Sequence, residues 1–497
     1  MDNLVSILIF TPLLAALILA IFLRGDDDAA RQNAKWLALT ATGATFAIAL
    51  ALFVGFDPDT IDFQFVESRP ALFGLSYRVG VDGLSLGFIM LVTALMPIAV
   101  GASWMLTDRV KAYVIALLSF ETLILGAITS LDLVFFAFFF EASFIPLLFL
   151  AGLWGGKGSG VVALKSWLYT LPGTILLIIA LTMIAREAGT SDVTALLRHN
   201  FSTDGGGWLP GGGQSALWLM IAASVAVKLA LWPLHTWLPG LAAKAPLAVG
   251  LLAACLLTKL GLYGFMRLLI SMLPKGTEAL APYIMALAGI GLLLGALAAF
   301  SAAGLGRLLG YLAVAHSGFL TLVLMAQNVV SFDAVLMAAL GGSFALAGLF
   351  AMAGMLEERA RSREIAAFGA LKQKMPVMAA FFAFFALAAF GLPGTASFVG
   401  LFLSVIGVIQ ASLGAAVVLS LGALLIAACG LLLHRRIMLG GLIKESFKIL
   451  PDLQGRERMV LSLLVGMTVV LGIWPGLMLE RTGPSFAALA EMFAALP

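Results

Sequence analysis

Hydrophobic and polar residues occur in long blocks along this chain, where apolar segments of roughly twenty residues are separated by short polar connections. An apolar segment of about 20 residues is long enough to cross a bilayer as an α-helix. The pattern therefore predicts an all-α polytopic membrane protein with about fourteen transmembrane helices. The predicted helices cover residues 3–23, 35–55, 82–105, 112–129, 131–152, 164–185, 215–238, 247–271, 280–301, 306–327, 332–355, 376–411, 413–434 and 459–480.

Proline and glycine interrupt two of these helices, the seventh at residues 232–240 and the twelfth at residues 391–395. Proline removes a backbone donor, and the freed backbone groups at membrane depth must be satisfied by protein or water. Broken helices in corresponding halves are typical of transporters built from two inverted repeats. We therefore predict N-terminal helices at 1–111, a first repeat at 112–271, a second repeat at 280–434, and a basic loop with a last helix at 435–497.

The composition excludes a soluble protein. Of the 497 residues, 62% are hydrophobic and only 11% are charged, whereas a soluble domain carries about 25% charged residues. A large core does not explain the deficit, because a soluble protein must still present a polar surface to water. Most of the surface is therefore expected to face the lipid bilayer.

Lys and Arg are concentrated in the loops that follow odd-numbered helices. Cytoplasmic loops of membrane proteins carry this excess, so both termini are predicted on the periplasmic side of a bacterial inner membrane. The basic stretches 356–375 and 435–458 are then cytoplasmic, as solvated loops or as docking surfaces for partners. The loop at 186–214, which contains six glycines near its end, is predicted outside and flexible.

Five titratable residues lie near the middle of predicted helices, where a charge costs roughly 2.5–3.5 kcal/mol on insertion scales. They are Glu121, Glu141, Lys228, Lys259 and His316. Arg24, Lys165 and Arg267 lie near helix ends, where long side chains are expected to reach the interface.

The central residues allow two interpretations. They form either structural ion pairs or a lateral path along which charge moves at one membrane depth. Five groups in successive segments favour the path, because a change of protonation at one group alters the charge balance of the next.

Other kinds of site find little support. The two cysteines, Cys255 and Cys429, lie in apolar runs, and the four histidines are far apart in sequence. We therefore expect this chain to bind no metal, haem or iron–sulfur cluster. The sequence also contains no glycine-rich phosphate loop after a strand, and no basic stripe that would indicate nucleic acid.

Several motifs together resemble the antiporter-like membrane subunits of respiratory complex I, which are related to subunits of multi-component sodium/proton antiporters. The resemblance covers almost the whole chain and is strongest to chain M of bacterial NADH–quinone oxidoreductases, the equivalent of mitochondrial subunit 4. The motifs lie at residues 80–86, 131–134, 139–146, 152–156, 232–239, 259–265, 315–318, 392–395 and 398–400.

The resemblance implies a role for each central residue. Glu141 resembles the essential glutamate of the fifth helix, and Lys228 resembles its lysine partner on the broken seventh helix. Lys259 resembles the central lysine, and His316 resembles a connector toward the second half-channel. Glu121 matches a further membrane glutamate of the fourth helix.

The resemblance also implies that this chain holds no cofactor. NADH, flavin, iron–sulfur clusters and quinone are then expected in partner subunits. The partners implied are other membrane-arm subunits of complex I, including adjacent antiporter-like subunits.

The chain departs from the family pattern mainly in its second half. Leu401 stands where the family has a glutamate, Gly342 falls near a family histidine, and residues 304–307 lack a family Asp-Met-Lys-Lys. Residues 240–246 also lack a carboxylate and an imidazole. Without a glutamate at Leu401, two explanations remain for the end of the implied proton path. Either the proton leaves through a partner's carboxylate or a water wire, or this subunit does not complete the outward transfer of a proton. The clustering of the losses favours the second explanation.

The sequence thus predicts a membrane-arm subunit of a proton-pumping NADH–quinone oxidoreductase, a translocase subunit that carries out no redox catalysis itself. Two alternatives remain. One is a subunit of a multi-component cation/proton antiporter, which the motif at 152–156 disfavours. The other is a structural paralogue with reduced pumping, which Leu401 and Gly342 favour and the retained Glu141, Lys228 and Lys259 disfavour.

Overall fold

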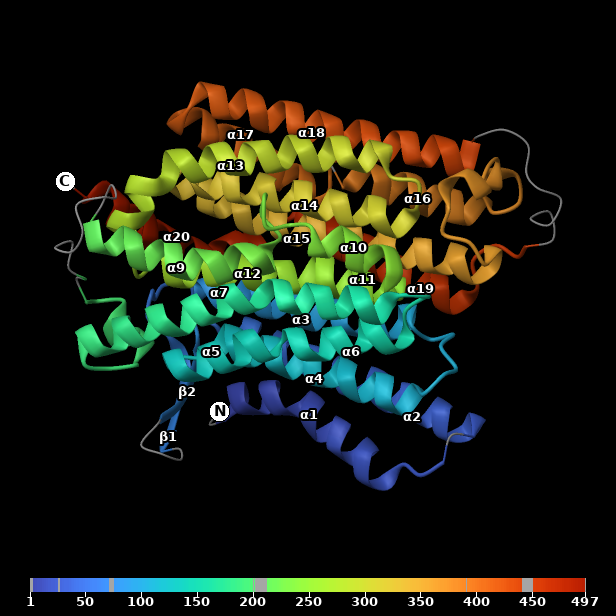
Figure 1. Ribbon diagram of the computed structural model, residues 1–497, viewed down its shortest axis with the longest axis horizontal. Helices are drawn as coiled ribbons and strands as arrows, with labels where there is room; N and C mark the ends of the chain where they lie inside the picture. Colours follow the sequence, from blue (N-terminus) through green and yellow to red (C-terminus); the bar gives the residue numbers. More distant parts are fainter. Residues whose placement is uncertain are drawn as a thin grey trace.

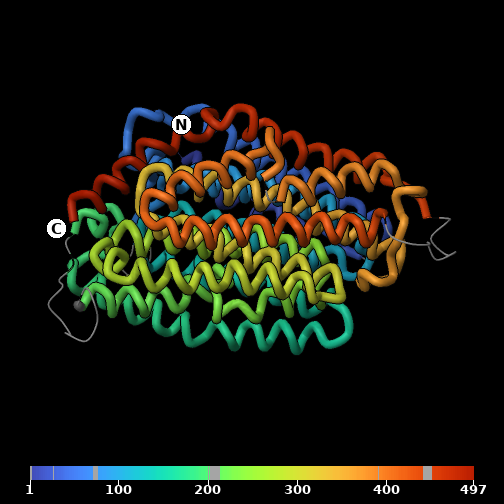
Figure 2. The backbone as a smooth tube through the Cα atoms, turned by 90° about the horizontal axis from the view of Figure 1, so that it is seen from above, coloured from blue at the N-terminus to red at the C-terminus, as the bar shows by residue number. Residues whose placement is uncertain are grey.

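The computed structural model describes residues 3–25, 27–70, 76–199, 201, 212–389, 391–439 and 450–496. Most helices run along one common axis in an elongated bundle (Figure 1), and the view from above shows the same arrangement (Figure 2). Among the described residues, eleven helices are long and apolar enough to cross a membrane. The predicted all-α polytopic membrane fold is confirmed.

The chain begins with four long helices and a β-hairpin. The helices are α1 (Leu4–Phe22), α2 (Asp28–Gly55), α3 (Gly83–Ala102) and α4 (Val110–Thr129), and the hairpin strands are β1 (Gln64–Pro70) and β2 (Ser76–Val81). The strands pair antiparallel, with Glu67 opposite Val79. Glu67 also accepts hydrogen bonds from the backbone N–H groups of Val5 and Ser6 at 2.8 and 3.1 Å. The hairpin thus supplies an acceptor for the first turn of α1. The hydrophobic pattern predicted only a connection between two helices at this point.

The next segment contains the first predicted central residues. Its helices are α5 (Leu133–Ala142), α6 (Phe144–Trp154), α7 (Ser159–Ala188), the short α8 (Val193–Leu196), α9 (Gly212–Leu229) and α10 (Trp237–Lys244). Helices α5 and α6 together form one membrane-length segment. Residues 200 and 202–211, which include most of the glycine-rich loop, lie outside the described residues.

The centre of the bundle follows. Its elements are α11 (Leu247–Leu252), the π-helical η2 (Ala253–Leu257), α12 (Thr258–Gly264), the π-helical η3 (Phe265–Ile270), α13 (Pro274–Ser301), α14 (Leu305–Leu324) and α15 (Val329–Ala360). The most apolar window of α15 is completely buried, and that of the segment from α11 to η3 is 94% buried. These two segments therefore face protein rather than lipid.

The last part of the chain contains the second break. Its elements are the 3₁₀ turns η4 (Ile365–Ala367) and η5 (Leu371–Gln373), then α16 (Pro376–Ala388), α17 (Ala396–Ala411), α18 (Leu413–His434), the π-helical η6 (Arg435–Leu439), α19 (Gly455–Ile473) and α20 (Gly476–Ala494). The predicted last helix at 459–480 is wrong at its end. The axis bends by 63° between α19 and α20, because Pro475 cannot continue the hydrogen bonding of α19.

Arg267 does not lie where its position near a helix end predicted. It was expected to reach the membrane interface, but it is buried and its Nη2 donates to both carboxylate oxygens of Asp82 at 2.6 and 2.7 Å. Asp82 also accepts from the backbone N–H of Ser85 at the start of α3. The partners lie 185 positions apart in the sequence, so helix-end position alone did not reveal the pair.

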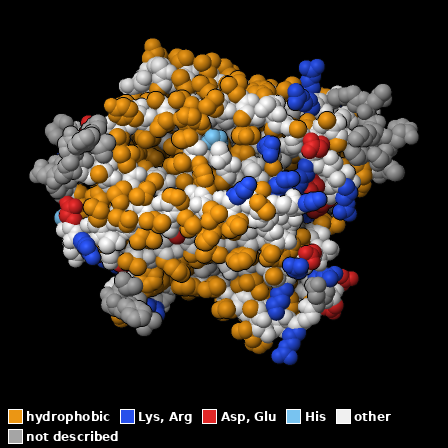
Figure 3. All heavy atoms as spheres, in the orientation of Figure 1, with side chains coloured by type: hydrophobic (Ala, Val, Ile, Leu, Met, Phe, Trp, Pro, Cys, Tyr) orange, Lys and Arg blue, Asp and Glu red, His pale blue; other side chains and the backbone are white. Residues whose placement is uncertain are grey.

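Charge is unevenly distributed along the bundle axis. Both chain termini lie toward the same end (Figure 1), while Lys and Arg side chains gather at the opposite end on the face seen in Figure 3. This arrangement agrees with the loop pattern in the sequence.

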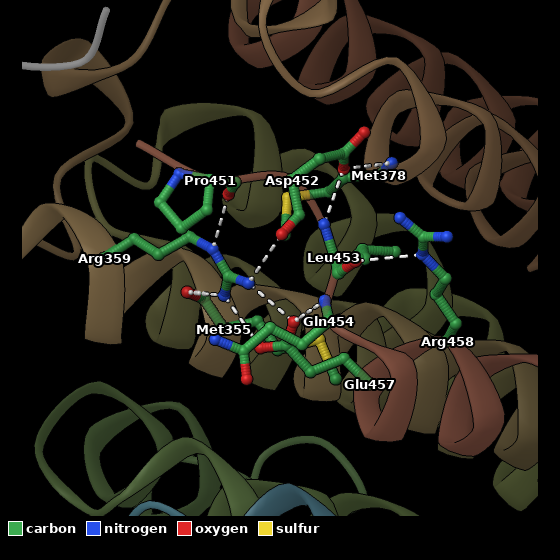
Figure 4. A network of polar contacts seen from close by, with 9 residues as sticks. All are labelled: Met355, Arg359, Met378, Pro451, Asp452, Leu453, Gln454, Glu457 and Arg458. Atoms are coloured by element: carbon green, nitrogen blue, oxygen red, sulfur yellow. Dashed lines mark hydrogen bonds and ion pairs between the residues drawn. The ribbon is translucent and has the colours of Figure 1, made fainter. Parts of the chain in front are cut away.

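At the basic end, part of the stretch 435–458 is held firmly against α15 and α16 (Figure 4). Arg359 donates to both carboxylate oxygens of Glu457 at 2.8 and 2.5 Å, and this pair is buried. Asp452 accepts from the backbone N–H groups of Val377 and Met378, which open α16. Residues 450–458 are therefore packed against the bundle, whereas the sequence suggested a solvated loop, and residues 440–449 lie outside the described part.

Candidate functional site

The break between α9 and α10 places one central residue next to an interruption of the backbone. Ala230 has a positive φ of 55° just after α9 ends. The indole Nε1 of Trp237 donates to the carbonyl of Val227 at 2.7 Å. A protein side chain thus satisfies one carbonyl near the break, as a backbone interruption at membrane depth requires. Lys228 lies in the last turn of α9, next in sequence to Val227, whose carbonyl accepts this hydrogen bond.

Glu141 and Lys228 form an ion pair across α5 and α9. Lys228 Nζ lies 3.0 Å from Glu141 Oε2, and the lysine side chain is 1% exposed while that of the glutamate is 17% exposed. The ammonium also lies 4.3 Å from the centre of the Phe140 ring. An ammonium buried this deeply is stabilised by its carboxylate and by the aromatic face.

Two hydroxyl groups hold the carboxylate of Glu141. Thr174 of α7 donates to Oε2 at 2.6 Å, and Ser224 of α9 donates to Oε1 at 2.8 Å. Sequence reasoning missed both residues. The structure shows what brings them together at Gly173, where a Cβ would lie 2.8 Å from the backbone of Ser224. Only glycine allows α7 and α9 to approach so closely, and this approach brings the two hydroxyls to one carboxylate.

Glu141 also borders a cavity of about 830 Å³. Helices α5, α6 and α7 form its walls, including Phe138, Ile145 and Ile178, whose side chains are exposed. One side of the ion pair therefore faces this groove while the lysine is buried in the bundle.

Lys259 and His316 form the second contact. Lys259 Nζ lies 3.1 Å from His316 Nδ1, and Lys259 is 1% exposed. The ammonium also approaches the hydroxyl of Thr258 at 3.4 Å and the carbonyl of Ala254 at 3.5 Å. Of these three contacts, the one to the imidazole nitrogen is the shortest. Among the described residues, no carboxylate hydrogen-bonds to this lysine.

The helices that carry the two lysines are in direct contact. A Cβ on Gly261 of α12 would lie 2.5 Å from the backbone nitrogen of Leu229, the neighbour of Lys228. The glycine therefore permits the end of α9 to pack against α12. Four of the five predicted residues thus form two contacting pairs on adjacent elements.

Glu121 does not join these pairs. It is completely buried in α4, and neither carboxylate oxygen has a hydrogen-bond partner within the described part of the chain. Its predicted role in proton transfer stays a prediction.

The second half of the site is mostly apolar. His316, Gly342, Ser397 and Leu401 line a cavity of about 30 Å³ next to the break between α16 and α17. At this break Gly391 and Gly394 have positive φ values of 107° and 86°, a backbone conformation that glycine adopts readily. The structure therefore brings Gly342 and Leu401, the two positions that the resemblance singled out, to the same place as His316.

An arginine side chain donates hydrogen bonds to the carbonyl groups at the C-terminus of α10. Arg363 Nη1 donates to the carbonyls of Ala243 and Ala245 at 3.1 and 2.7 Å, and Arg363 Nε donates to Glu357 at 2.6 Å. A cation at a helix C-terminus is favourable because the last carbonyls carry partial negative charge. The stretch 240–246 is thus joined to the loop after α15.

Similarity to known proteins agrees with this geometry. The model of the family described as NADH:quinone oxidoreductase/Mrp antiporter membrane subunits matches residues 130–427. NADH-quinone oxidoreductase subunit M of Rhodobacter capsulatus is 41% identical over 500 residues, covering 100% of this chain and 98% of that protein. The chain belongs to this family of antiporter-like membrane subunits.

Other members of the family are similar along their whole length. NADH-ubiquinone oxidoreductase chain 4 of Arabidopsis thaliana is 33% identical, covering 97% of this chain and 96% of that protein. A chain in the structure of respiratory complex I from Thermus thermophilus superimposes with a TM-score of 0.88 at 27% identity, covering 98% of this chain and 99% of that chain. The resemblance to chain M is confirmed, and the site described above lies almost entirely within the matched family region.

Proposed function

We propose that this chain is a membrane-arm subunit of a proton-pumping NADH–quinone oxidoreductase and that it moves protons along Glu141, Lys228, Lys259 and His316. The observation that carries the proposal is the arrangement of these residues in two contacting pairs, at 3.0 Å and 3.1 Å, on helices that touch each other. Buried titratable groups in membrane segments usually mark an ion or proton path.

The geometry supports a stepwise transfer. Glu141, next to an open groove, can take up a proton and weaken its attraction for Lys228. A change in the charge of Lys228 then alters the balance at Lys259, because charges in a poorly polarisable interior interact strongly. Lys259 contacts an imidazole nitrogen directly, so a proton can pass between them without crossing an apolar gap.

Partner subunits complete the function. Among the described residues, no group of three His, Cys, Asp or Glu side chains could hold a metal ion. We propose that NADH, flavin, iron–sulfur clusters and quinone are bound by partners. The names of the relatives mention NADH and quinone for their own complexes. Quinone reduction there would drive the change of protonation here.

Purification of the native complex through a tag on this chain tests the proposal. We expect it to contain flavin and iron–sulfur proteins, and we expect reconstituted vesicles to acidify when NADH reduces quinone. Cation/proton exchange without NADH oxidation would instead support the alternative, a subunit of a multi-component antiporter.

The orientation in the membrane is a separate prediction. The positive charge at one end indicates that this end is cytoplasmic, with both termini periplasmic and the chain in the inner membrane of a bacterium. Gln373→Cys at the basic end and Asp59→Cys at the other end are both exposed positions. The native Cys255 and Cys429 are buried and should not react.

An impermeant maleimide should label Gln373→Cys only in inverted vesicles and Asp59→Cys only in spheroplasts. The opposite pattern would reverse the orientation.

A further inference from the structure

The cavity beside the second break is large enough to hold solvent. Its volume is about 30 Å³, and one water molecule requires a cavity of roughly 10–15 Å³. His316 of α14 lies on one wall, and Ser397 and Leu401 of α17 lie on another. The cavity therefore connects the last residue of the proposed path to the broken twelfth helix.

Ser397 has an unpaired hydroxyl in this cavity. The residue is 7% exposed, and its Oγ has no hydrogen-bond partner among the described residues. A buried hydroxyl without a partner costs roughly 1–3 kcal/mol, and nearly all such groups in native proteins are paired with protein or with ordered water. The nearby Ser404 differs, because its hydroxyl donates to the carbonyl of Gly400 at 2.6 Å.

Gly342 explains how the imidazole reaches the cavity. A Cβ at this position would lie 2.3 Å from His316 Nε2 and 2.5 Å from Cε1. Any other side chain would therefore displace the ring. The two nitrogens consequently face different surroundings, with Nδ1 at Lys259 and Nε2 at Gly342, which lines the cavity.

Leu401 closes the cavity with an apolar surface. Its Cδ2 would lie 2.9 Å from a Cβ at Gly391, so the leucine packs tightly against the break. The polar groups around the space are a ring nitrogen of His316, the hydroxyl of Ser397 and the backbone of Ala338, which also lines the cavity and hydrogen-bonds to the imidazole.

We propose that this cavity is a water-binding site, in which about one or two waters link His316 Nε2 to Ser397 Oγ and carry the proton outward past the apolar side chain of Leu401. This inference rests on the proton translocation proposed above. It favours the water-wire explanation of the missing carboxylate over the absence of outward transfer, which the sequence alone favoured.

The transfer is balanced in protons. A proton from Lys259 reaches Nδ1 of a ring that carries its proton on Nε2, which gives an imidazolium. Nε2 then releases its proton to the cavity water and leaves a neutral ring protonated on Nδ1. The ring must return to the Nε2 tautomer before it accepts the next proton from Lys259. The water passes one proton to Ser397 Oγ while this hydroxyl gives up its own proton to water on the outer side. No bond other than O–H and N–H bonds changes.

The test measures protons moved per NADH oxidised in the assembled complex, reconstituted in liposomes. Ser397→Ala should lower this ratio to the value of a Glu141→Gln complex. Ser397→Thr, which keeps the hydroxyl, should retain the wild-type ratio, as should Ser404→Ala, a matched control on the same helix. Leu401→Glu in the Ser397→Ala chain should restore the ratio, because it supplies a titratable group to the same space.

The outcomes separate this inference from the proposed function. A wild-type ratio for Ser397→Ala, together with a reduced ratio for Glu141→Gln, overturns the water site and leaves the function intact. Wild-type ratios for both variants refute both. If Ser397→Ala does not assemble, Gly342→Ala decides, because its methyl group must displace the His316 ring. A wild-type ratio for that variant also overturns the relay.

Discussion

Glu141→Gln should reduce NADH-driven proton translocation by about tenfold or more through this subunit while the complex still assembles. Positioned acid–base groups contribute on the order of 10²–10⁴-fold to proton-transfer steps, and glutamine can neither bind nor release a proton. Assembly should survive because the glutamine amide keeps one oxygen that accepts from one of the hydroxyls of Thr174 and Ser224, and its NH2 group can donate to the oxygen of the other. Lys228 also keeps its contact with Phe140.

The measurement compares proton uptake in reconstituted vesicles with the amount of assembled complex on native gels. Glu278→Gln is a suitable control, because it makes the same change at an exposed position. Normal pumping by an assembled Glu141→Gln complex would show that the ion pair is structural only. Loss of assembly in proportion to loss of pumping would support the same conclusion.

Lys259→Met and Lys259→Arg should both abolish most of the translocation, for different reasons. Methionine removes the titratable group. Arginine keeps a charge near His316 but does not release a proton at physiological pH. The expected loss is again about tenfold or more, and the arginine variant separates a need for charge from a need for deprotonation.

Lys165 provides the matched pair of controls, because it is an exposed lysine of α7. Lys165→Met and Lys165→Arg should both pump like the wild type. If Lys259→Arg pumps normally in the same vesicles, deprotonation at this position is not part of the cycle, and Lys259 acts only as a fixed charge.

Much of the architecture could be predicted because the bilayer imposes a simple length requirement on apolar segments. The segments predicted from the sequence match the helices closely from α1 to α18, including both breaks. The last helix was extended too far across Pro475, since apolar residues continue on both sides of the bend. The β-hairpin was missed because its partner strands and the α1 terminus that it caps are not visible in local hydrophobicity.

The candidate site could be predicted only in part. A charge in an apolar segment is conspicuous, so Glu141, Lys228, Lys259 and His316 could be predicted from the sequence alone. Thr174 and Ser224 were not found, because hydroxyl residues are common in membrane helices and only contact with a carboxylate distinguishes them.

The sequence by itself determined that this chain spans a membrane, where the seventh and twelfth predicted helices break and which titratable residues lie in the middle of apolar segments, because these properties depend on residue type and order along the chain. Only the tertiary structure decided which of these residues touch, that Glu121 stays apart, that Arg267 is buried against Asp82, and that Ser397, Gly342 and Leu401 surround one space with His316. Contacts between distant helices depend on the close approach of small residues such as Gly173, Gly261 and Gly342. That approach is a property of packing in three dimensions, so a one-dimensional pattern does not contain it.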